Sequence, residues 1–436
     1  MPKIKRLIIH YTDLRGFIRS VERLYENNNS IENILATTDG SSVYGFENIE
    51  RSDLVLKPDL STLTEVPWNN NVMRSLAMIY TPDGERYNKD PRFVAEKTNN
   101  LLRELGYKIM IGAELEFFLL KKLELSFDEH GLQIFMRQEL AEDSWYKKIY
   151  HETDSQDPLF IYRLRLIEYL ENMRYGVETS HHEVARSQIE LSLKAGDPVY
   201  LGDEIVTTKW VAKHVANEMG MRPVFMPKPL YEMNGSGLHL HISLWRDDKN
   251  LFYDGSGLSD VARYFIGGLI EHCRSLAAII APTTNSYKRL VPGYEAPVYC
   301  LWSRYNRSVA IRIPYASDER RVRIEFRPPD PSSNPYLAVS AVILAGLDGI
   351  NRKIDPGPEF VGNAYKLSQE DVKRNRIMTL PRNLEEALEE LENDHDYLKP
   401  VFSKDLVESY IEIKREEIRE IDKRPSPYEF MLYADI

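Results

Sequence analysis

The sequence predicts an α+β protein with a small N-terminal domain and a larger C-terminal domain. Three observations support this. The chain has 436 residues, too many for one small core. Short strand-like runs separated by turn residues dominate its first part. Beyond them, strands and helices alternate irregularly rather than as strict βαβ units. We therefore expect a mostly β domain over residues 1–89 and a mixed domain over residues 90–436.

In the first domain, strands are expected at 5–13 (KRLIIHYTD), 41–46 (SSVYGF) and 52–59 (SDLVLKPD). A helix should follow. Asp90 is a good N-cap, Pro91 suits the first helical turn, and Gly106 is suited to end the helix. The pattern thus places a helix between the two predicted domains.

The second domain mixes strand-like and helical segments. Strands are expected at 107–120, 186–193, 238–245, 308–314 and 320–328. Helices are expected at 163–173, 203–220, 382–394 and 403–422, with one long amphipathic helix over 260–282.

Composition narrows the function classes. The formal net charge of -11 argues against a nucleic-acid binder and is compatible with cation binding. No apolar run approaches the ~20 residues that span a bilayer, so no membrane association is expected, and the N-terminus shows no secretory signal. The only cysteines, Cys273 and Cys300, lie outside any CxxC motif, which predicts buried thiols in a reducing cytoplasm.

Acidic residues occupy strand positions where apolar residues are expected. In the segment 107–120, Glu114 and Glu116 lie two apart, so they should share one face, with Leu115 and Phe117 on the other. Similar segments carry further acids and imidazoles: Glu183, Glu190, His239, His241 and Glu325. Two buried carboxylates on one face repel each other and lose hydration.

Divalent cations would make this arrangement tolerable. Mg²⁺ and Mn²⁺ prefer carboxylate oxygens, with an occasional imidazole for Mn²⁺, whereas an acid cluster without cysteines disfavours zinc. A single glutamate in a strand more often lies on the solvated face of an antiparallel sheet. For any one of these residues we prefer the solvated face as the explanation. For all of the acids and imidazoles taken together we favour a metal site.

Arginines provide a second signal. Arg289, Arg304, Arg307 and Arg312 lie near one another in sequence, and four more follow between 320 and 327. The planar guanidinium matches phosphate or carboxylate, so a cluster beside a metal site suggests phosphoryl transfer. The alternative is that the arginines form a solvated basic edge, and this explanation is a strong one for Arg320 and Arg321. Neither common phosphate-binding loop is present.

These stretches together resemble a known family. The segments TDLRG (12–16), DGSSVYGFENIERSDLVLKPD (39–59), MPKPLYEMNGSGLHLHISL (226–244), PTTNSYKRLVPGYEAPVYCLWSRYNRS (282–308) and RIEFRPPDPSSNPYL (323–337) look like the signatures of glutamine synthetase of the bacterial and archaeal type I class. The resemblance spans nearly the whole chain. It implies a β-grasp N-terminal domain and a catalytic domain with a curved antiparallel sheet flanked by helices.

The resemblance also implies an activity and an assembly. ATP would phosphorylate the γ-carboxylate of glutamate, and ammonia would displace the phosphate. The active sites would lie between subunits of a dodecamer made of two hexameric rings, locked by a C-terminal strap that the tail RPSPYEFMLYADI (424–436) resembles. The resemblance allows a nitrogen-regulatory protein as a further partner.

Residue roles carry over by position. Glu116, Glu183 and Glu190 resemble the ligands of the metal nearer glutamate, and Glu114, His239 and Glu325 those of the metal at the ATP phosphates. Positions that resemble ATP contacts are Glu178, His241, Ser243, Arg312 and Arg320; those that resemble glutamate contacts are Asn234, Gly235, Arg289 and Arg327. Arg307 resembles the residue that stabilises the transferring phosphate, and Glu295 the flap residue. Asp39, supported by Asp53, resembles the ammonium-binding residue contributed by the adjacent subunit.

Two stretches depart from the family pattern. Arg186 and Ser187 replace a pair that usually ends in glycine, and Glu232 and Met233 replace a pair that usually begins with glycine. They keep open a second function, the joining of glutamate to an organic amine such as a polyamine or ethanolamine. Asp39 and Asp53 favour ammonia, because a bulky amine does not need an ammonium pocket. A non-catalytic relative would lack metal ligands, and all six are present.

Overall fold

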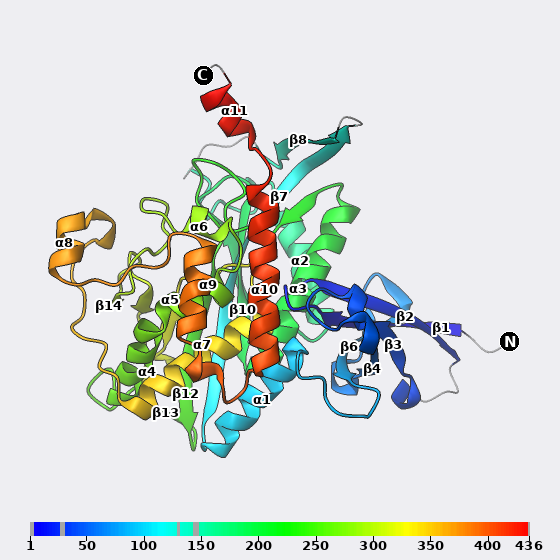
Figure 1. Cartoon of the computed structure of the whole chain (residues 1–436), viewed down its shortest axis with the longest axis horizontal. Helices are drawn as coiled ribbons and strands as arrows, with labels where there is room; N and C mark the ends of the chain where they lie inside the picture. The colour runs from blue at the N-terminus through cyan, green and yellow to red at the C-terminus, as the bar shows by residue number, and fades with distance from the viewer. Residues whose placement is uncertain (1–3, 27–30, 129–130, 143–147, 435–436) are drawn as a thin grey trace.

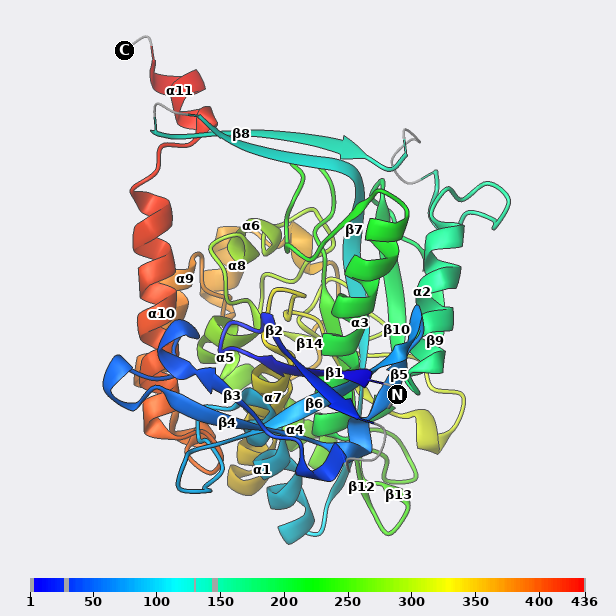
Figure 2. The ribbon, with the colours of Figure 1, turned by 90° about the vertical axis from the view of Figure 1, so that its right-hand side faces the viewer.

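The computed structural model describes residues 4–26, 31–128, 131–142 and 148–434. Figures 1 and 2 show a small N-terminal layer beside a larger body of sheet and helices. In the described part of the chain, no helix is both long and apolar enough to cross a membrane.

The N-terminal sheet is a β-grasp arrangement. Its strands are β1 (Ile4–Thr12), β2 (Ile18–Glu26), β3 (Ala36–Asp39), β4 (Asp53–Pro58), β5 (Thr64–Val66) and β6 (Asn69–Tyr80). The order is β2-β1-β6-β4-β3, with β5 also paired to β6. The central pair β1–β6 is parallel and the other pairs are antiparallel. The predicted N-terminal fold is confirmed.

The strand expected at 41–46 is wrong. Gly40–Ser42 form a short 3-10 helix, and the chain then turns at Gly45, whose φ is +79°. The Asp39 side chain accepts a hydrogen bond from the Ser41 backbone N–H, so a local side-chain contact overrides the strand propensity of the valine and aromatic residues that follow.

The expected helix after the first sheet is present as α1 (Pro91–Glu104). Asp90 caps it by accepting a hydrogen bond from the Arg92 N–H, and Gly106 follows its end with φ at +71°. The capping signals read from the sequence are therefore confirmed.

A mixed, largely antiparallel sheet forms the larger body. Its strands are β7 (Lys108–Asp128), β8 (Gly131–Leu140), β9 (Val177–His182), β10 (Gln188–Gly196), β11 (Arg222–Val224), β12 (Leu238–Arg246), β13 (Lys249–Asn250), β14 (Trp302–Arg304), β15 (Ile311–Ile313) and β16 (Ile324–Phe326). The main order is β14-β15-β16-β12-β7-β10-β9, and only β14–β15 is parallel among its pairs.

Helices accompany this sheet. They are α2 (Phe160–Asn172), α3 (Pro198–Glu218), α4 (Asp260–Glu271), α5 (Cys273–Ile280), α6 (Ser286–Arg289), α7 (Pro335–Arg352), α8 (Gln369–Arg374), α9 (Leu384–Asn393), α10 (Lys404–Asp422) and α11 (Pro427–Tyr433). In both views α11 extends beyond the end of α10, away from the body (Figures 1 and 2). Its residues Tyr428, Met431 and Tyr433 are exposed.

The long helix expected over 260–282 is two helices. The break lies at His272, whose backbone leaves the helical conformation at φ −92° and ψ 7°. Its imidazole is bound on both sides, 2.9 Å from Asp348 of α7 and 2.8 Å from Asp394 after α9. These partners are more than 70 residues away, so helical periodicity could not reveal the break.

One core supports the functional face. Leu115, Phe117, Leu191 and Leu240 are fully buried on one side of the sheet. Cys273 and Cys300 are buried, as the sequence predicts. The opposite side of these strands carries the polar residues described next.

Candidate active site

Strand register gathers the predicted acids and imidazoles on one face. The β7–β12 pairing places His239 opposite Glu114, and the β7–β10 pairing places Glu190 opposite Glu116. The β12–β16 pairing places His241 opposite Glu325. Because directly opposed residues share a face, the prediction for Glu114 and Glu116 is confirmed.

Glu114, His239, His241 and Glu325 form what we call the imidazole cluster. Glu114 Oε2 lies 2.9 Å from His239 Nδ1, and Glu114 Oε1 lies 2.9 Å from His241 Nε2. Burial alone would raise the pKa of Glu114, but these two imidazoles hold that pKa well below its usual range.

Glu325 is compensated by arginines. Its carboxylate is fully buried and accepts hydrogen bonds of 2.5 Å from Arg312 Nη1 and from Arg327 Nη1. Burial opposes ionisation, but Arg327 and the nearby histidines lower the pKa of Glu325 to about 2. The imidazole cluster is therefore neutralised from within the chain.

Glu116, Glu183 and Glu190 form a second group, the carboxylate cluster. Burial and the neighbouring Glu116 and Glu190 raise the pKa of Glu183 to about 8, and burial with repulsion from Glu114 and Glu116 raises that of Glu190 well above its usual range. Among the described residues, no lysine or arginine forms an ion pair with Glu183 or Glu190. Arg307 offsets only part of the rise in the pKa of Glu190, so this cluster is less well compensated than its neighbour.

Both clusters suit divalent cations. Glu114, His241 and Glu325 offer ligand atoms within 4.8 Å of one another, and so do His181, Glu183 and Glu190. Carboxylate oxygens with one imidazole are donors that Mg²⁺ and Mn²⁺ accept. The raised pKa values of Glu183 and Glu190 indicate that a cation would relieve their repulsion.

A cavity of about 580 Å³ opens beside the imidazole cluster. Of the predicted site residues, Glu114, Glu178, His241, Ser243 and Arg320 line it. Sequence reasoning assigned no site role to the other lining residues, among them Trp245 and Arg323. Trp245 donates to Ser243 Oγ at 2.9 Å, and Arg323 Nε lies 3.1 Å from His241 Nδ1. The period-2 alternation along 238–245 would have found Trp245.

A smaller cavity of about 40 Å³ adjoins the carboxylate cluster. It brings together a second predicted set, namely Glu116, Glu183, Glu190, Asn234, Gly235, His239, Arg289, Glu295, Arg307 and Arg327. His239 connects the two cavities, because it lines the smaller one and hydrogen-bonds Glu114 at the larger one.

Close backbone packing shapes the smaller cavity. Arg289 is buried and donates to the carbonyls of Pro328 and Arg327 at 2.8 and 3.0 Å. A Cβ on Gly235 would lie 2.4 Å from the Pro227 carbonyl oxygen, so only glycine allows this approach.

The loop carrying Glu295 covers the smaller cavity. Glu295 is exposed and has a left-handed backbone with φ of +60°. Its carbonyl accepts a hydrogen bond from Arg327 Nη2 at 3.2 Å.

Four predicted residues line neither cavity. Two of them, Arg312 and Glu325, are bound to each other. Asp39 and Asp53 pair across β3 and β4, are exposed, and also line neither cavity. Hydrogen bonds from the Ser41 and Ser42 hydroxyls lower the pKa of Asp39 to about 2.

The departures from the family pattern keep a glycine-like backbone. Ser187 and Glu232 have φ of +59° and +60°, in the left-handed region that favours glycine. Ser187 is fully buried, and its N–H donates to Glu142 Oε1 at 2.8 Å. Both positions thus have a backbone conformation that glycine adopts freely and that strains a residue with a side chain.

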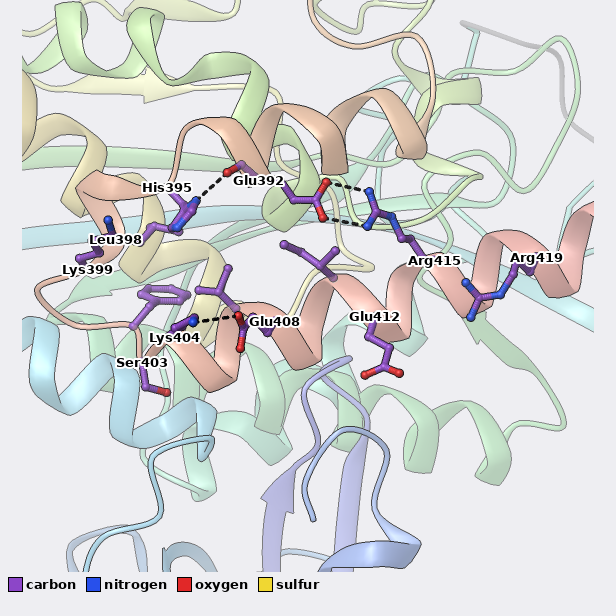
Figure 3. A pocket seen from close by; sticks show the side chains of 13 residues that line it. Glu392, His395, Leu398, Lys399, Ser403, Lys404, Glu408, Glu412, Arg415 and Arg419 are labelled. Carbon is purple, nitrogen blue, oxygen red and sulfur yellow. Dashed lines mark hydrogen bonds and ion pairs between the residues drawn. The ribbon is translucent and has the colours of Figure 1, made fainter. Parts of the chain in front are cut away.

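Another cavity, about 800 Å³, lies between α9 and α10 (Figure 3). Two hydrogen bonds of 2.8 and 2.7 Å join Arg415 to Glu392 across it. It contains none of the predicted site residues, so its size alone does not make it a candidate active site.

Comparisons with known proteins agree with this geometry. Residues 88–433 match the family model "Glutamine synthetase, catalytic domain", and residues 3–82 match "Glutamine synthetase, beta-Grasp domain". The chain is 42% identical to a glutamine synthetase of Sulfolobus acidocaldarius, over 99% of this chain and 96% of that protein. It is 43% identical to one of Pyrococcus horikoshii, over 90% and 85%.

Solved structures are similar throughout the chain. A Plasmodium falciparum glutamine synthetase, determined by cryo-electron microscopy, superposes with a TM-score of 0.87 at 30% identity, covering 99% of this chain and 96% of that one. A complex of GmaS with ADP gives 0.85 at 28% identity, covering 100% and 98%.

Proposed function

Because the chain belongs to the glutamine synthetase family, we propose that it joins ammonia to the γ-carboxylate of L-glutamate with conversion of ATP to ADP and phosphate. One observation supports this most: the imidazole and carboxylate clusters adjoin at His239, between a larger cavity and a smaller one. Phosphoryl transfer between two bound molecules needs such a junction.

Each cluster would hold one Mg²⁺ or Mn²⁺. The proposed ligands are Glu114, His239 and Glu325 on one side and Glu116, Glu183 and Glu190 on the other. Cations bound there would offset the negative charge that the phosphates and the γ-carboxylate bring together.

ATP is proposed to occupy the larger cavity. Its volume of about 580 Å³ lies in the range of small-molecule sites. Glu178, His241, Ser243 and Arg320 line it, and Arg312 adjoins through its bond to Glu325. In this position the γ-phosphate would point toward His239 and the smaller cavity.

Glutamate is proposed to bind at the smaller cavity through Asn234, Gly235, Arg289 and Arg327. The cavity of about 40 Å³ is small for an amino acid, and we propose that the loop carrying Glu295 moves to admit glutamate.

In the first step, a γ-carboxylate oxygen of glutamate attacks the γ-phosphorus of ATP and the bond to ADP breaks. The guanidinium of Arg307, at the rim of the cavity, would stabilise the transferring phosphoryl group. The product is γ-glutamyl phosphate, which closure of the Glu295 loop would protect from water.

In the second step, ammonia attacks the γ-carbon and the bond to phosphate breaks. Asp39 of a neighbouring subunit, supported by Asp53, is proposed to bind ammonium and accept its proton. A carboxylate with a pKa of about 2 is fully charged at neutral pH, so it attracts ammonium. Accepting the proton requires the pKa of Asp39 to rise, as burial against the neighbouring subunit would cause.

A shared site requires an oligomer, and we propose the dodecamer of two hexameric rings. Support comes from the exposed Asp39 and Asp53, which line neither cavity of their own chain, and from the exposed apolar residues of α11. The buried thiols Cys273 and Cys300 fit the proposed cytoplasmic location. A solution mass of fewer than twelve chains would contradict the assembly.

Phosphate release with ATP and glutamate tests the reaction. Turnover should be fastest with ammonium and much slower with putrescine or ethanolamine. Faster turnover with an organic amine would instead favour the γ-glutamylamine ligase activity.

Mixing variants tests the shared site. Asp39→Ala should lose use of ammonium while retaining ADP binding, and Glu325→Gln should lose turnover. If each active site draws on two subunits, dissociation and joint reassembly of the two variants should restore part of the activity. If Asp39→Ala used ammonium as well as the wild type does, the proposed role of Asp39 would be contradicted.

A further inference from the structure

His181 lies beside the carboxylate cluster but outside both proposed ligand sets. It stands opposite Glu190 in the β9–β10 pairing, on the same face of the sheet. Its Nε2 is 3.2 Å from Glu190 Oε1. Ligand atoms of His181, Glu183 and Glu190 all lie within 4.8 Å of one another.

The ring of His181 is oriented by its surroundings. Nδ1 lies 3.2 Å from the His182 carbonyl oxygen. Since a carbonyl only accepts hydrogen bonds, Nδ1 must carry a proton, and in the neutral ring Nε2 presents a lone pair. His151 packs edge-on at 4.4 Å and 66°, and Tyr150 does so at 5.7 Å and 78°.

That lone pair faces electron-rich atoms. In the metal-free protein this nitrogen and the Glu190 oxygen, 3.2 Å apart, share a hydrogen-bonding proton, and a cation bound between them would take the place of that proton. A carbonyl bonded to the far nitrogen is the usual support of a metal-ligating histidine, because it fixes both tautomer and ring direction. The arrangement at His181 has this form.

Glu116 is placed differently. Its Oε2 accepts hydrogen bonds from the Gly237 N–H at 2.8 Å and from Gln188 Nε2 at 3.2 Å. One of its oxygens is therefore already engaged, whereas His181 Nε2 is directed at the other two carboxylates. The carboxylate cluster is thus supplemented by a nitrogen donor.

On the premise of the proposed function, we propose that His181 is a nitrogen ligand of the cation at the carboxylate cluster and that it biases this site toward Mn²⁺ over Mg²⁺. Mg²⁺ prefers an all-oxygen shell and keeps its waters, whereas affinity for imidazole is greater for transition metals. With His181 the site offers nitrogen and oxygen donors together.

Metal titration of His181→Ala tests this. Calorimetry on the intact, nucleotide-free oligomer should show Mn²⁺ affinity falling by about 10-fold or more, with Mg²⁺ affinity falling much less. His214→Ala is the matched control, because His214 pairs with Glu218 on α3 and should leave both affinities unchanged. Equal losses for both ions, or no loss, would overturn the proposal. Failure of the wild type to bind either ion would instead contradict the proposed function.

A second measurement does not depend on the folding of a variant. In wild-type protein labelled with ¹⁵N-histidine and loaded with Mn²⁺ at both clusters, electron spin echo modulation should show one imidazole bound to every Mn²⁺, His239 at one cluster and His181 at the other. If half of the bound Mn²⁺ showed no imidazole coupling, His181 would be excluded as a ligand.

Discussion

The two clusters on the sheet face contain similar acids in opposite electrostatic states. Glu325 of the imidazole cluster lies between two guanidinium groups and has a pKa of about 2. Glu183 of the carboxylate cluster faces Glu116 and Glu190, and its pKa is about 8. Burial penalises the charge of both, so the difference comes from the neighbours that each strand register supplies.

This difference indicates two ways of building a cation site. The imidazole cluster is held in shape by bonds within the chain, because Arg312, Arg327 and two histidines already balance its acids. The carboxylate cluster is less well balanced, and the cation proposed to bind there would complete it. Measurements of the free energy of unfolding of the metal-free protein should distinguish the two clusters. A Glu→Gln change removes a charge that pairs with arginines in the imidazole cluster, whereas it removes a charge that repels its neighbours in the carboxylate cluster.

The largest effect is expected for Glu325→Gln. It leaves Arg312 and Arg327 without their shared counter-ion in a buried position. We expect the free energy of unfolding of the metal-free protein to fall by about 3–5 kcal/mol, measured by denaturant titration at fixed protein concentration.

Glu190→Gln is the matched change in the carboxylate cluster. Because Glu190 has no arginine or lysine ion-pair partner among the described residues, its neutralisation should leave the metal-free protein as stable as wild type or more so. If Glu325→Gln and Glu190→Gln lowered the free energy of unfolding equally, the proposed difference in charge balance between the two clusters would be contradicted.

Adding metal should produce the next largest effect. At 100 times its Kd, a cation that binds only the folded protein stabilises it by about 2.7 kcal/mol. We expect Mn²⁺ to raise the melting temperature of the wild type, and EDTA to reverse this. In Glu183→Gln/Glu190→Gln the increase should be much smaller; an unchanged increase would mean that the carboxylate cluster is not the site responsible.

The pH dependence of stability should also differ between the clusters. The pKa of Glu183 is raised in the folded protein from about 4.5 to about 8, so its contribution is fully present below pH 4.5 and is lost as pH rises through 8. Between pH 5 and 8, metal-free wild type should therefore lose roughly 3 kcal/mol relative to Glu183→Gln.

Glu325 has the opposite dependence. Its folded pKa is lowered to about 2, so its contribution is present above about pH 4.5 and is lost as pH falls toward 2. It should contribute no slope between pH 5 and 8. Parallel stability profiles for wild type and Glu183→Gln across that range would refute the raised pKa of Glu183.

The sequence predicts most of the residues on the polar face of the sheet. It does not predict that the pKa values of the acids are lowered in one cluster and raised in the other. The period-2 spacing of Glu114 with Glu116, and of His239 with His241, was enough to place each pair on one side of a strand. Which charges meet across strands depends on register between segments far apart in the chain. Glu190 opposes Glu116 from 74 positions away, for example, and local spacing does not encode such pairing.

The errors in the fold have the same origin. The helix break at His272 coincides with hydrogen bonds to Asp348 of α7 and to Asp394 just after α9, both far away along the chain. The missing strand at 41–46 depends on a side-chain bond from Asp39. Apolar periodicity records burial, but a specific polar contact can redirect the backbone without changing that pattern.

The smallest effect concerns the backbone behind the carboxylate cluster. Glu183 and Glu190 flank a turn that contains Ser187, whereas the residues of the imidazole cluster lie on regular strands. Ser187 has φ of +59°, is fully buried, and leaves its hydroxyl without a hydrogen-bond partner. Left-handed serine and a buried unpaired hydroxyl each cost about 1–3 kcal/mol, and glycine removes both at the expense of greater freedom in the unfolded chain.

We therefore expect Ser187→Gly to stabilise the protein by roughly 1 kcal/mol. The Ser187 N–H that donates to Glu142 is retained in the variant, so the position of the turn should not change. Ser187→Ala is the control, since it removes the hydroxyl but keeps the strained backbone, and should give a smaller gain. Equal stability of the Gly and Ala variants would show that strain at this turn is not significant, and that the two clusters differ in charge alone.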